Sequence, residues 1–549
     1  MGQSQRSNAA AVALISVVAL CVVLPFARLG IPSGHDFEFH MNSWIEVVDH
    51  WKQGNFYPHW AAMAHYGYGE ARFIFYPPFS WTLGAALGLL LPWKLVPAVY
   101  IWIVLTMAGC SMFFVARTWL SWADATFTAA LYLANPYNLV IVYWRSAFAE
   151  LMAAIYLPLL FWLLLRADED YRRIVVPLSV LMAAGWLTNL PSAVMMNYSL
   201  AVLAAAVALK RRSFVALVYS GVAVIVGAAL AGFYLLPAFH EQHWVEIGQV
   251  LGPGVRPSDN FLFTGTEDLD HNRFNLLVSM VAVSEIAIFA VSMVLWLRRG
   301  WHTTRKFAFI WGFICAVVML RPTLALWNHL PELRFVQFPW RWLLCLNVPL
   351  ALAAAFAIRR WWWRAAASAV MLAVLLSGWH RVQSPWWDSA ADIKEMLDNQ
   401  ADRIGNEGTD EYVPAGADAY EIDKNAPLVF YEGKGSAQFS IQRWSPERRE
   451  FTVNASAPGN LVLRLFNYPS WKVTVNGRLT ESTTVGHTGQ MVVPIDAAKN
   501  KVDIYFVKGW DDKAGMLISA LSLMFIAAWF YSTKTSSLRS PGLPPTAPN

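Results

Sequence analysis

Long apolar runs recur along the whole chain and are separated by short polar segments. A run of roughly 17–25 apolar residues is long enough to cross a bilayer as a helix. The runs therefore predict an α-helical polytopic membrane protein with about 12–13 hydrophobic segments. No A-x-A cleavage site follows the first run, so we interpret it as a retained helix and not as a signal peptide. The thirteen runs lie at 9–27, 79–92, 95–116, 123–143, 147–165, 174–190, 192–209, 214–237, 276–297, 307–323, 341–358, 365–381 and 513–532.

Clusters of lysine and arginine between the runs orient the helices. Such clusters stay on the cytoplasmic side, which predicts that the N- and C-termini are both cytoplasmic. Thirteen crossings would place the C-terminus outside, so one segment is expected not to span: 79–92, which is short, or 123–143, which Asn135-Pro136 interrupts. Either choice leaves Arg145 and Glu150 on the outer side. The clusters are Arg166/Arg172/Arg173, Lys210/Arg211/Arg212, Arg298/Arg299/Arg305/Lys306, Arg359/Arg360/Arg364 and Lys534/Arg539.

Two larger polar regions are expected on the outer side, a first loop over residues 28–78 and a region over 382–512. Short runs in the second region alternate between apolar and polar residues, as half-buried strands do, and Asn476-Gly477 is a hairpin signal. We predict a transmembrane domain over 1–381 whose first outer loop is catalytic, an extracytoplasmic β-sandwich-like domain over 382–512, a final transmembrane helix over 513–533 and a disordered cytoplasmic tail over 534–549.

Composition narrows the class of protein further. Of 549 residues, 56% are hydrophobic and 14% are charged, whereas about a quarter of an ordinary soluble chain is charged. This excludes a soluble enzyme, a disordered protein and a coiled coil. The net charge of +5 lies mostly in short loops, so it reports topology and not nucleic-acid binding. All four cysteines lie inside apolar runs, so no disulfide framework is expected.

The first outer loop carries the clearest candidate chemistry, the carboxylates Asp36 and Glu38. Apolar residues at helical spacing over 41–51 predict an amphipathic helix in the membrane interface, with both acids at its N-terminal end, at the depth of a lipid phosphate. Two other interpretations stay open. Asp36 can simply cap this helix. His35 and His40 can hold a divalent cation (Mg²⁺ or Mn²⁺) with the two acids, or be ordinary polar residues.

Several stretches give the chain a family resemblance. The acidic pair after helix one, the amphipathic helix and the Tyr-Pro-Pro entry to the next segment resemble the GT-C class of membrane glycosyltransferases. More narrowly, the chain resembles a bacterial branch of membrane proteins labelled pyruvoyl-tetrahydropterin-synthase-related, although we find no residues that support pterin chemistry. The stretches are Gly54-x-x-Tyr57-Pro58-x-Trp60, Arg145-x4-Glu150, Leu235-Leu236-Pro237-Ala238, Gln337-Phe338-Pro339-Trp340-Arg341, Glu411-Tyr412-Val413-Pro414 and Tyr468-Pro469-Ser470-Trp471.

The resemblance implies an inverting transfer of a sugar from a polyprenyl-phosphate donor to an envelope glycan, lipid or protein at the outer face of the bacterial inner membrane. A phosphate leaving group needs no general acid, so one carboxylate suffices as general base. We assign that role to Asp36, with Glu38 as its helper. No cofactor is implied beyond a possible divalent cation, held by Asp36, Glu38 and His40 if present. The expected partners are the donor, the acceptor and membrane lipid, with no nucleic acid.

Arginines on the outer side are the candidates for the donor phosphate, because guanidinium binds phosphate in a bidentate fashion. We select Arg145, Arg341 and Arg72; in the alternative, Arg145 only pairs with Glu150 and Arg341 only reaches toward headgroups. Aromatic residues of the loop suit either stacking on sugar rings or anchoring in the interface. The residues predicted to line the substrate cavity are His35, His40, Tyr57, Trp60, Tyr76, Glu150 and Asn189, the last at a position where relatives often have histidine.

Two further acids need an interpretation. Glu285 lies in the middle of an apolar run and is expected to be neutral and hydrogen-bonded to a neighbouring helix. Glu241, in the segment 240–243, is expected to be solvated. Two rival functions remain, a transporter or flippase of lipid-linked glycans and a non-catalytic envelope scaffold. The transporter is disfavoured because the charges concentrate in one outer loop and no repeat relates the two halves.

Overall fold

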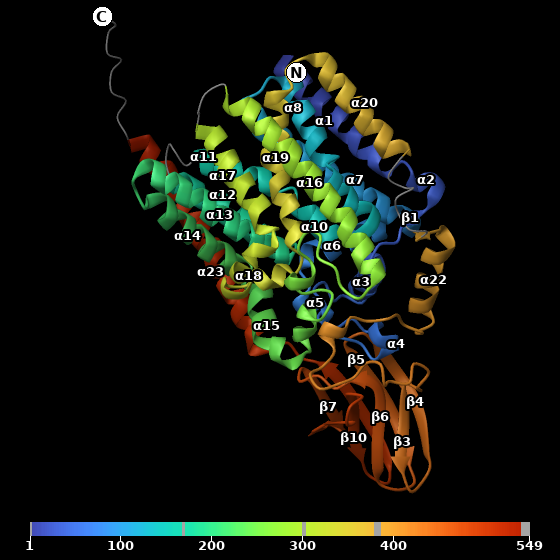
Figure 1. Cartoon of the computed structure of the whole chain (residues 1–549). Helices are drawn as coiled ribbons and strands as arrows, with labels where there is room; N and C mark the ends of the chain where they lie inside the picture. The colour runs from blue at the N-terminus through green and yellow to red at the C-terminus, as the bar shows by residue number, and fades with distance from the viewer. Residues whose placement is uncertain (1–2, 167–170, 299–302, 378–385, 540–549) are drawn as a thin grey trace, which may run out of the picture.

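The computed structural model describes residues 3–166, 171–298, 303–377 and 386–539. A bundle of helices forms the larger part, and a lobe of strands projects from one end of it (Figure 1). The predicted fold class, a polytopic membrane protein with a β-rich region near the C-terminus, is confirmed. Residues 540–549, most of the predicted disordered tail, lie outside the described residues, and 534–539 continue the last helix.

The helices follow the apolar runs. The longer helices are α1 (Gln3–Val23), α3 (Phe37–Lys52), α6 (Pro78–Leu90), α7 (Val96–Ala116), α8 (Trp122–Leu133), α11 (Leu157–Arg166), α12 (Tyr171–Trp186), α13 (Leu190–Arg211), α14 (Val215–Leu230), α15 (Gly232–Glu241), α16 (Leu269–Leu297), α17 (Thr303–Val318), α19 (Leu343–Ala357), α20 (Trp361–Ser377), α22 (Ala390–Ala401) and α23 (Trp510–Arg539).

Short helical pieces connect these elements, several of them where the chain must turn close to the candidate site. They are α2 (Phe26–Leu29), α4 (Ala64–Gly67), α5 (Arg72–Phe75), α9 (Pro136–Val140), α10 (Phe148–Ala153), α18 (Leu324–His329), the π-helical turn η2 (Ile141–Arg145) and the 3-10 turns η1 (Trp93–Leu95), η3 (Gln242–Trp244), η4 (Ile247–Leu251), η5 (Pro257–Asp259), η6 (Arg321–Thr323), η7 (Leu333–Val336), η8 (Pro339–Trp342) and η9 (Asp410–Tyr412).

Among the described residues, eight helical segments are long and apolar enough to cross a membrane, and two bent pairs raise the number to ten. The bends are 77° between α14 and α15 and 90° between α17 and the η6–α18 segment. Helix α6 has only 13 residues, which at 1.5 Å per residue is about 20 Å, less than the roughly 30 Å of a hydrocarbon core. Its length favours 79–92 over 123–143 as the segment that does not span.

The strands of the β lobe form two antiparallel sheets. One has the order β3-β6-β10-β9 and the other β4-β5-β11-β7-β8, and a common core lies between them. The predicted hairpin is present, with Val475 opposite Arg478 and with positive φ at Asn476 (55°) and Gly477 (78°), as a two-residue turn requires. The strands are β3 (Val429–Gly433), β4 (Ala437–Ser445), β5 (Arg448–Ala455), β6 (Gly459–Phe466), β7 (Trp471–Val475), β8 (Arg478–Thr480), β9 (Thr483–Thr484), β10 (Gln490–Ile495) and β11 (Lys499–Phe506).

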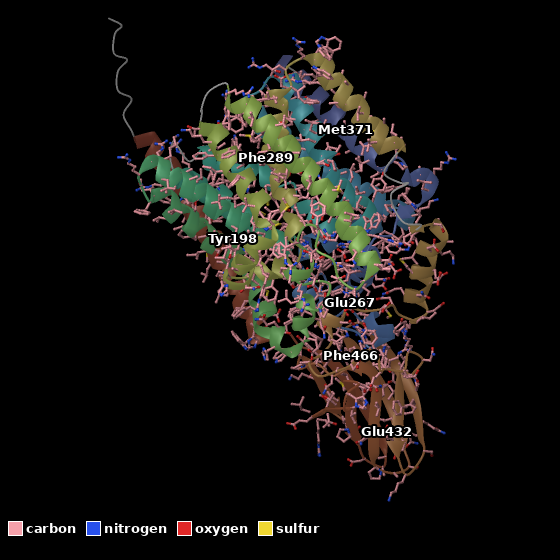
Figure 2. The ribbon with its side chains drawn as sticks, viewed as in Figure 1. Tyr198, Glu267, Phe289, Met371, Glu432 and Phe466 are labelled. Atoms are coloured by element: carbon pink, nitrogen blue, oxygen red, sulfur yellow. The ribbon has the colours of Figure 1, made fainter. Side chains whose placement is uncertain are left out.

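The first outer loop lies between the helices and the β lobe. Its residues 60–75 share a hydrophobic cluster with the lobe, and the backbone N–H of Phe466 donates to Tyr68 O (3.0 Å). Figure 2 shows Phe466 at the end of the lobe nearest the helices and Glu432 farther away. Helix α3 covers the predicted amphipathic segment, but its polar residues Glu46 and His50 are buried. Other parts of the chain therefore cover the polar face of this helix, and its place in the membrane interface stays a prediction.

Candidate functional site

The loop before α3 is fixed against the turn that follows η2. Gly34 N donates to Ser146 Oγ (3.0 Å), and Ser146 Oγ donates to Pro32 O (2.9 Å). Asp36 N donates to Arg145 O (2.9 Å). A Cβ atom on Gly34 would lie 2.3 Å from Trp144 O, so only glycine permits this approach. The contact brings Asp36 beside Arg145, 109 positions later in the chain.

Asp36 occupies the N-cap position of α3, but its side chain makes no capping hydrogen bond. Within the described ranges, no side chain or backbone donor is hydrogen-bonded to the half-buried carboxylate, and no ion pair is formed. The alternative that Asp36 serves only as a helix cap therefore lacks its contact. The carboxylate is left available to a ligand.

Arg145, Glu150 and Arg341 form a buried charge network behind this loop. Glu150 Oε2 accepts hydrogen bonds from Arg145 Nη1 (2.5 Å) and Arg341 Nε (3.0 Å), and Glu150 Oε1 accepts one from the Tyr137 hydroxyl (2.5 Å). Arg341 also donates through Nη1 to Gln337 Oε1 (3.0 Å). The pairing of Arg145 with Glu150, one of the two interpretations of Arg145, is thus present. Because two guanidinium groups share one carboxylate, the network keeps a net positive charge.

Aromatic rings cover the two guanidinium groups. The centre of the Arg145 guanidinium lies 4.9 Å from the Trp340 ring, and that of Arg341 lies 4.6 Å from the Phe338 ring. These contacts hold the planar groups in place and shield them from water. Asp36 lies close enough to both arginines for an electrostatic interaction. One carboxylate and two arginines are therefore assembled from three distant parts of the sequence.

His40 and Tyr76 lie next to the same carboxylate. The His40 ring stacks on Phe148, with centroids 5.1 Å apart, and its Nε2 has no hydrogen-bond partner in the described chain. Burial lowers the pKa of His40 to about 4, so the ring is neutral near pH 7. Burial, and then the charge of Asp36, raise the pKa of Tyr76 well above its ordinary value.

A divalent cation does not fit the predicted ligand set. Glu38 is exposed, whereas His40 is buried among aromatic rings. Over the described residues, the ligand atoms of Asp36, Glu38 and His40 do not come together in a group that could hold a metal ion. Among the described residues, these three side chains therefore do not form a metal site.

An open groove of about 490 Å³ lies beside the loop that carries Asp36; His35 and Glu38 line it, whereas Asp36 does not. Its wall contains both residues of β2 (Trp387–Asp388), which pairs with β1 (Ile31–Pro32). Burial lowers the pKa of His35 and raises the pKa of Asp388 to about 6. Tryptophan rings and carboxylates thus lie side by side, a combination that suits a polar ligand with apolar faces. The lining residues are Ser33, Gly34, His35, Glu38, Trp386, Trp387, Asp388 and Asp392.

Arg72 belongs to a different network, which joins the first loop to the segment before the β lobe. It donates through Nε to Glu70 Oε1 (2.5 Å) and through Nη1 to Ser43 Oγ (2.9 Å). Glu70 also accepts from Thr409 N (2.9 Å) and lies 2.9 Å from His65 Nε2. Burial alone would raise the pKa of Glu70, but Arg72 and His65 lower it to about 2. These contacts give Arg72 a positioning role for the loop.

Three other predicted cavity residues lie away from Asp36. Tyr57 packs against Trp81 and Phe233, and Trp60 is buried beside Tyr468 of the β lobe. Asn189 caps α13 by accepting from Ser192 N (3.0 Å). The structure thus brings together Asp36, Glu38, His35, His40, Tyr76, Arg145, Glu150 and Arg341, but not Arg72, Tyr57, Trp60 or Asn189.

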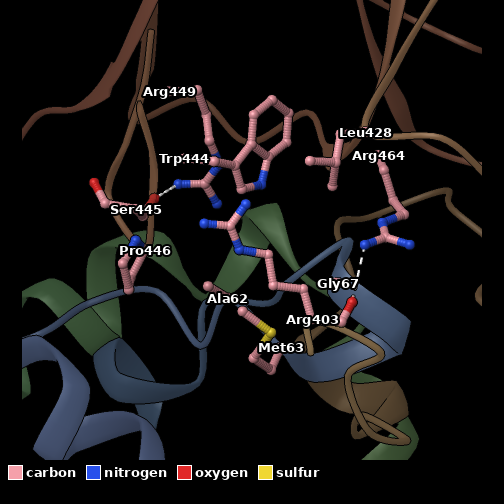
Figure 3. A pocket seen from close by; sticks show the side chains of 10 residues that line it. All are labelled: Ala62, Met63, Gly67, Arg403, Leu428, Trp444, Ser445, Pro446, Arg449 and Arg464. Carbon is pink, nitrogen blue, oxygen red and sulfur yellow. Dashed lines mark hydrogen bonds between the residues drawn. The ribbon is translucent and has the colours of Figure 1, made fainter. Parts of the chain in front are cut away.

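A small cavity of about 20 Å³ lies between the first loop and the β lobe (Figure 3). Arg403, Arg449 and Arg464 reach toward it, and Arg464 Nη2 donates to Arg403 O (3.0 Å). Burial lowers the pKa of Arg449 to about 9, while the rings of Trp444 and Trp471 lie 5.3 and 5.2 Å from its guanidinium. These arginines belong to the interface that holds the lobe, and sequence reasoning did not single them out.

Two partners of the buried charges, Gln337 and Tyr137, were not predicted from the sequence. Gln337 supports Arg341, and Tyr137 bridges Glu150 to Glu285, whose Oε1 accepts from Tyr137 N (3.0 Å). The expected hydrogen bond of Glu285 is thus formed, with the backbone of α9. Gln337 begins the stretch Gln337–Arg341 that contributes to the family resemblance, and this stretch could have pointed to its role. Nothing in the sequence pointed to a role for Tyr137 except its position directly after Asn135-Pro136.

Comparison with known families gives one match. Residues 73–384, more than half of the chain, match a family described as "6-pyruvoyl-tetrahydropterin synthase related domain; membrane protein". The matched range includes Arg145, Glu150 and Arg341 but begins after Asp36 and Glu38. No curated protein matches the chain.

Proposed function

The chain belongs to the 6-pyruvoyl-tetrahydropterin synthase related family of membrane proteins, and within that frame we propose that it is a glycosyltransferase of the GT-C type. It would move a sugar from a polyprenyl-phosphate donor to a glycan, lipid or protein of the cell envelope. The reaction would occur at the outer face of the bacterial inner membrane, where the β lobe is extracytoplasmic and both termini are cytoplasmic.

The observation that carries the proposal is the Asp36 carboxylate, which sits at a helix N-cap without capping it and lies beside two buried arginines. A free carboxylate next to a cationic, aromatic-lined cluster supplies a base and a phosphate site together. An acid that served only to start α3 would be bonded to the first N–H groups of that helix.

The proposed mechanism uses Asp36 as the general base. The acceptor hydroxyl oxygen attacks the anomeric carbon while the bond from that carbon to the phosphate oxygen breaks. Asp36 takes the hydroxyl proton, and polyprenyl phosphate leaves with the electron pair of the broken bond. A single displacement inverts the anomeric centre. No general acid is needed because the leaving phosphate is a weak base.

Arg145 and Arg341 would hold the phosphate. Glu150 neutralises one of their two charges, so one positive charge remains for the anionic donor. Over the described residues, Arg145 Nη2 and Arg341 Nη2 have no hydrogen-bond partner. Phosphate oxygens accept charge-assisted hydrogen bonds from such groups.

The groove beside Asp36 would receive the acceptor. Its tryptophans can stack on a sugar face, and Glu38 and Asp388 can accept hydrogen bonds from hydroxyl groups. Glu38 would help to orient the acceptor and would not itself take the proton, since it is exposed on the groove side.

The test is glycosyl transfer by purified protein in lipid from a panel of polyprenyl-phosphate sugars. Asp36→Asn should slow transfer by about 10²–10⁴-fold, whereas Asp268→Asn should not. Asp268 is a matched control because it is also an N-cap aspartate, and its side chain does accept from Asp270 N (2.8 Å). Equal transfer by wild type and Asp36→Asn would remove Asp36 as the base. No transfer from any donor that the folded protein binds would favour a flippase or a scaffold.

A further inference from the structure

Three buried carboxylates meet where the last helix joins the bundle. Glu241 ends α15, and Asp511 and Asp512 begin α23, all of them buried. One ligand oxygen from each lies within 4.8 Å of the other two. Figure 1 shows α15 and the start of α23 together beside the β lobe. The prediction that Glu241 is solvated was wrong. The start of α23, 270 residues later in the chain, covers it.

Hydrogen bonds fix outer oxygens of this cluster, one from the segment after β6 and one from the residue just before α23. The Tyr468 hydroxyl donates to Glu241 Oε2 (2.6 Å), and Gly509 N donates to Asp512 Oδ2 (3.0 Å). His59 Nε2 lies 2.7 Å from Asp512 Oδ1. Hydrogen bonds that orient carboxylates from outside are the usual surroundings of metal ligands.

One carboxylate oxygen of the cluster lacks a donor. Asp511 is 2% exposed, and its Oδ2 has no hydrogen-bond partner in the described part of the chain. No lysine or arginine of that part forms an ion pair with Glu241, Asp511 or Asp512, and the histidine that contacts Asp512 is His59. Buried carboxylates are costly unless a cation or a proton lies between them.

We propose that Glu241, Asp511 and Asp512 bind one hard divalent cation, such as Ca²⁺, Mg²⁺ or Mn²⁺. Carboxylate oxygens are the ligands that these ions prefer, and the unpartnered Asp511 oxygen supplies the open position. Tyr468 and His59 orient the ligands from outside. The site is separate from the Asp36 cluster and does not depend on the proposed transfer reaction.

The cation would fasten the β lobe to the helices. Its ligands come from two helices, and the orienting groups come from the first loop (His59) and from the segment between β6 and β7 (Tyr468). His59 N also donates to Glu447 Oε1 (2.8 Å) in the lobe. Loss of the cation should therefore loosen the lobe without altering Asp36 directly.

The test uses the full-length protein in detergent, stripped with a chelator and then supplied with Ca²⁺, Mg²⁺, Mn²⁺ or Zn²⁺ separately. We expect about one bound ion per chain by elemental analysis and a higher Tm with a hard cation than with the chelator. Asp511→Asn should weaken the apparent affinity at least about tenfold and remove the Tm response. Asp496→Asn, at an exposed aspartate of the lobe, should behave as wild type.

Three outcomes would overturn the proposed cation site. If a shared proton occupies the cluster, Asp511→Asn will keep or raise the Tm, and no cation will alter the Tm of the wild type. A wild type that holds no ion and is indifferent to chelation overturns the proposal even if the variant fails to fold. Stabilisation by Zn²⁺ alone would overturn the all-oxygen ligand set, because it would make His59 a ligand.

Discussion

Replacement of Glu150 by glutamine tests the buried charge network. The carboxylate accepts three hydrogen bonds, two of them from guanidinium groups at 2.5 and 3.0 Å. Glu150→Gln preserves the shape but leaves two buried arginines without the carboxylate to which both are hydrogen-bonded. Removal of one partner of a buried ion pair costs about 3–5 kcal/mol, so we expect the free energy of unfolding to fall by about that amount.

Glu285→Gln is the matched control. Glu285 is equally buried and is also bonded to Tyr137, but its partner is a backbone N–H and it forms no ion pair in the described chain. A neutral glutamic acid resembles glutamine in shape and in its hydrogen bonds. We therefore expect Glu285→Gln to change the free energy of unfolding by less than about 1 kcal/mol.

The assay is reversible unfolding in mixed micelles with increasing denaturing detergent, followed by tryptophan fluorescence. The expected difference between the two variants corresponds to about 30-fold or more in the unfolding equilibrium. A double variant, Glu150→Gln with Arg341→Gln, should recover part of the loss because one unpaired charge is removed. If Glu150→Gln and Glu285→Gln were equally stable, Glu150 would not be the counter-ion of the arginines.

Three further predictions concern the surroundings of Asp36. Gly34→Ala should reduce transfer and stability together, because its Cβ would lie 2.3 Å from Trp144 O, whereas Gly248→Ala, with no neighbouring atom within 4 Å, should do neither; equal behaviour of the two would refute the close approach. Unfolded chains protonate His40 below about pH 6.5 while the folded chain holds its pKa at about 4, so acidification across that window should cost up to about 3 kcal/mol of stability. His40→Phe should lessen this loss in Tm measured against pH, and an unchanged pH profile would contradict it. Arg341→Lys keeps the charge but loses the planar guanidinium, so the KM for donor should rise about tenfold or more; an unchanged KM would separate Arg341 from the phosphate.

Local patterns in the sequence predicted the elements well. Apolar runs gave the spanning helices, and Asn476-Gly477 gave the hairpin between β7 and β8, because both depend on neighbouring residues. Arg145 and Arg341 were selected because they were predicted to lie on the outer side, as Asp36 was. No spacing predicted that they lie close to Asp36, since the contact joins residues more than 100 positions apart.

Burial at the junction with the β lobe could not be predicted. Glu241 and Trp60 lie in polar or aromatic stretches that are typical of exposed loops, yet Asp511 and Tyr468 cover them from the far end of the chain. Which segment covers a loop is a property of the whole fold. The same limit explains why Arg72, an outer-loop arginine, pairs with Glu70 and does not reach Asp36.

The most direct test of the central claim separates donor binding from chemistry. Binding of a polyprenyl-phosphate sugar and single-turnover transfer are measured on the same preparations of wild type and Asp36→Asn in lipid. We expect equal donor affinity and a transfer rate that is lower by about 10²–10⁴-fold in the variant, the usual contribution of a general base. Equal transfer rates, or a wild type that binds the donor and never transfers its sugar, would contradict the assignment.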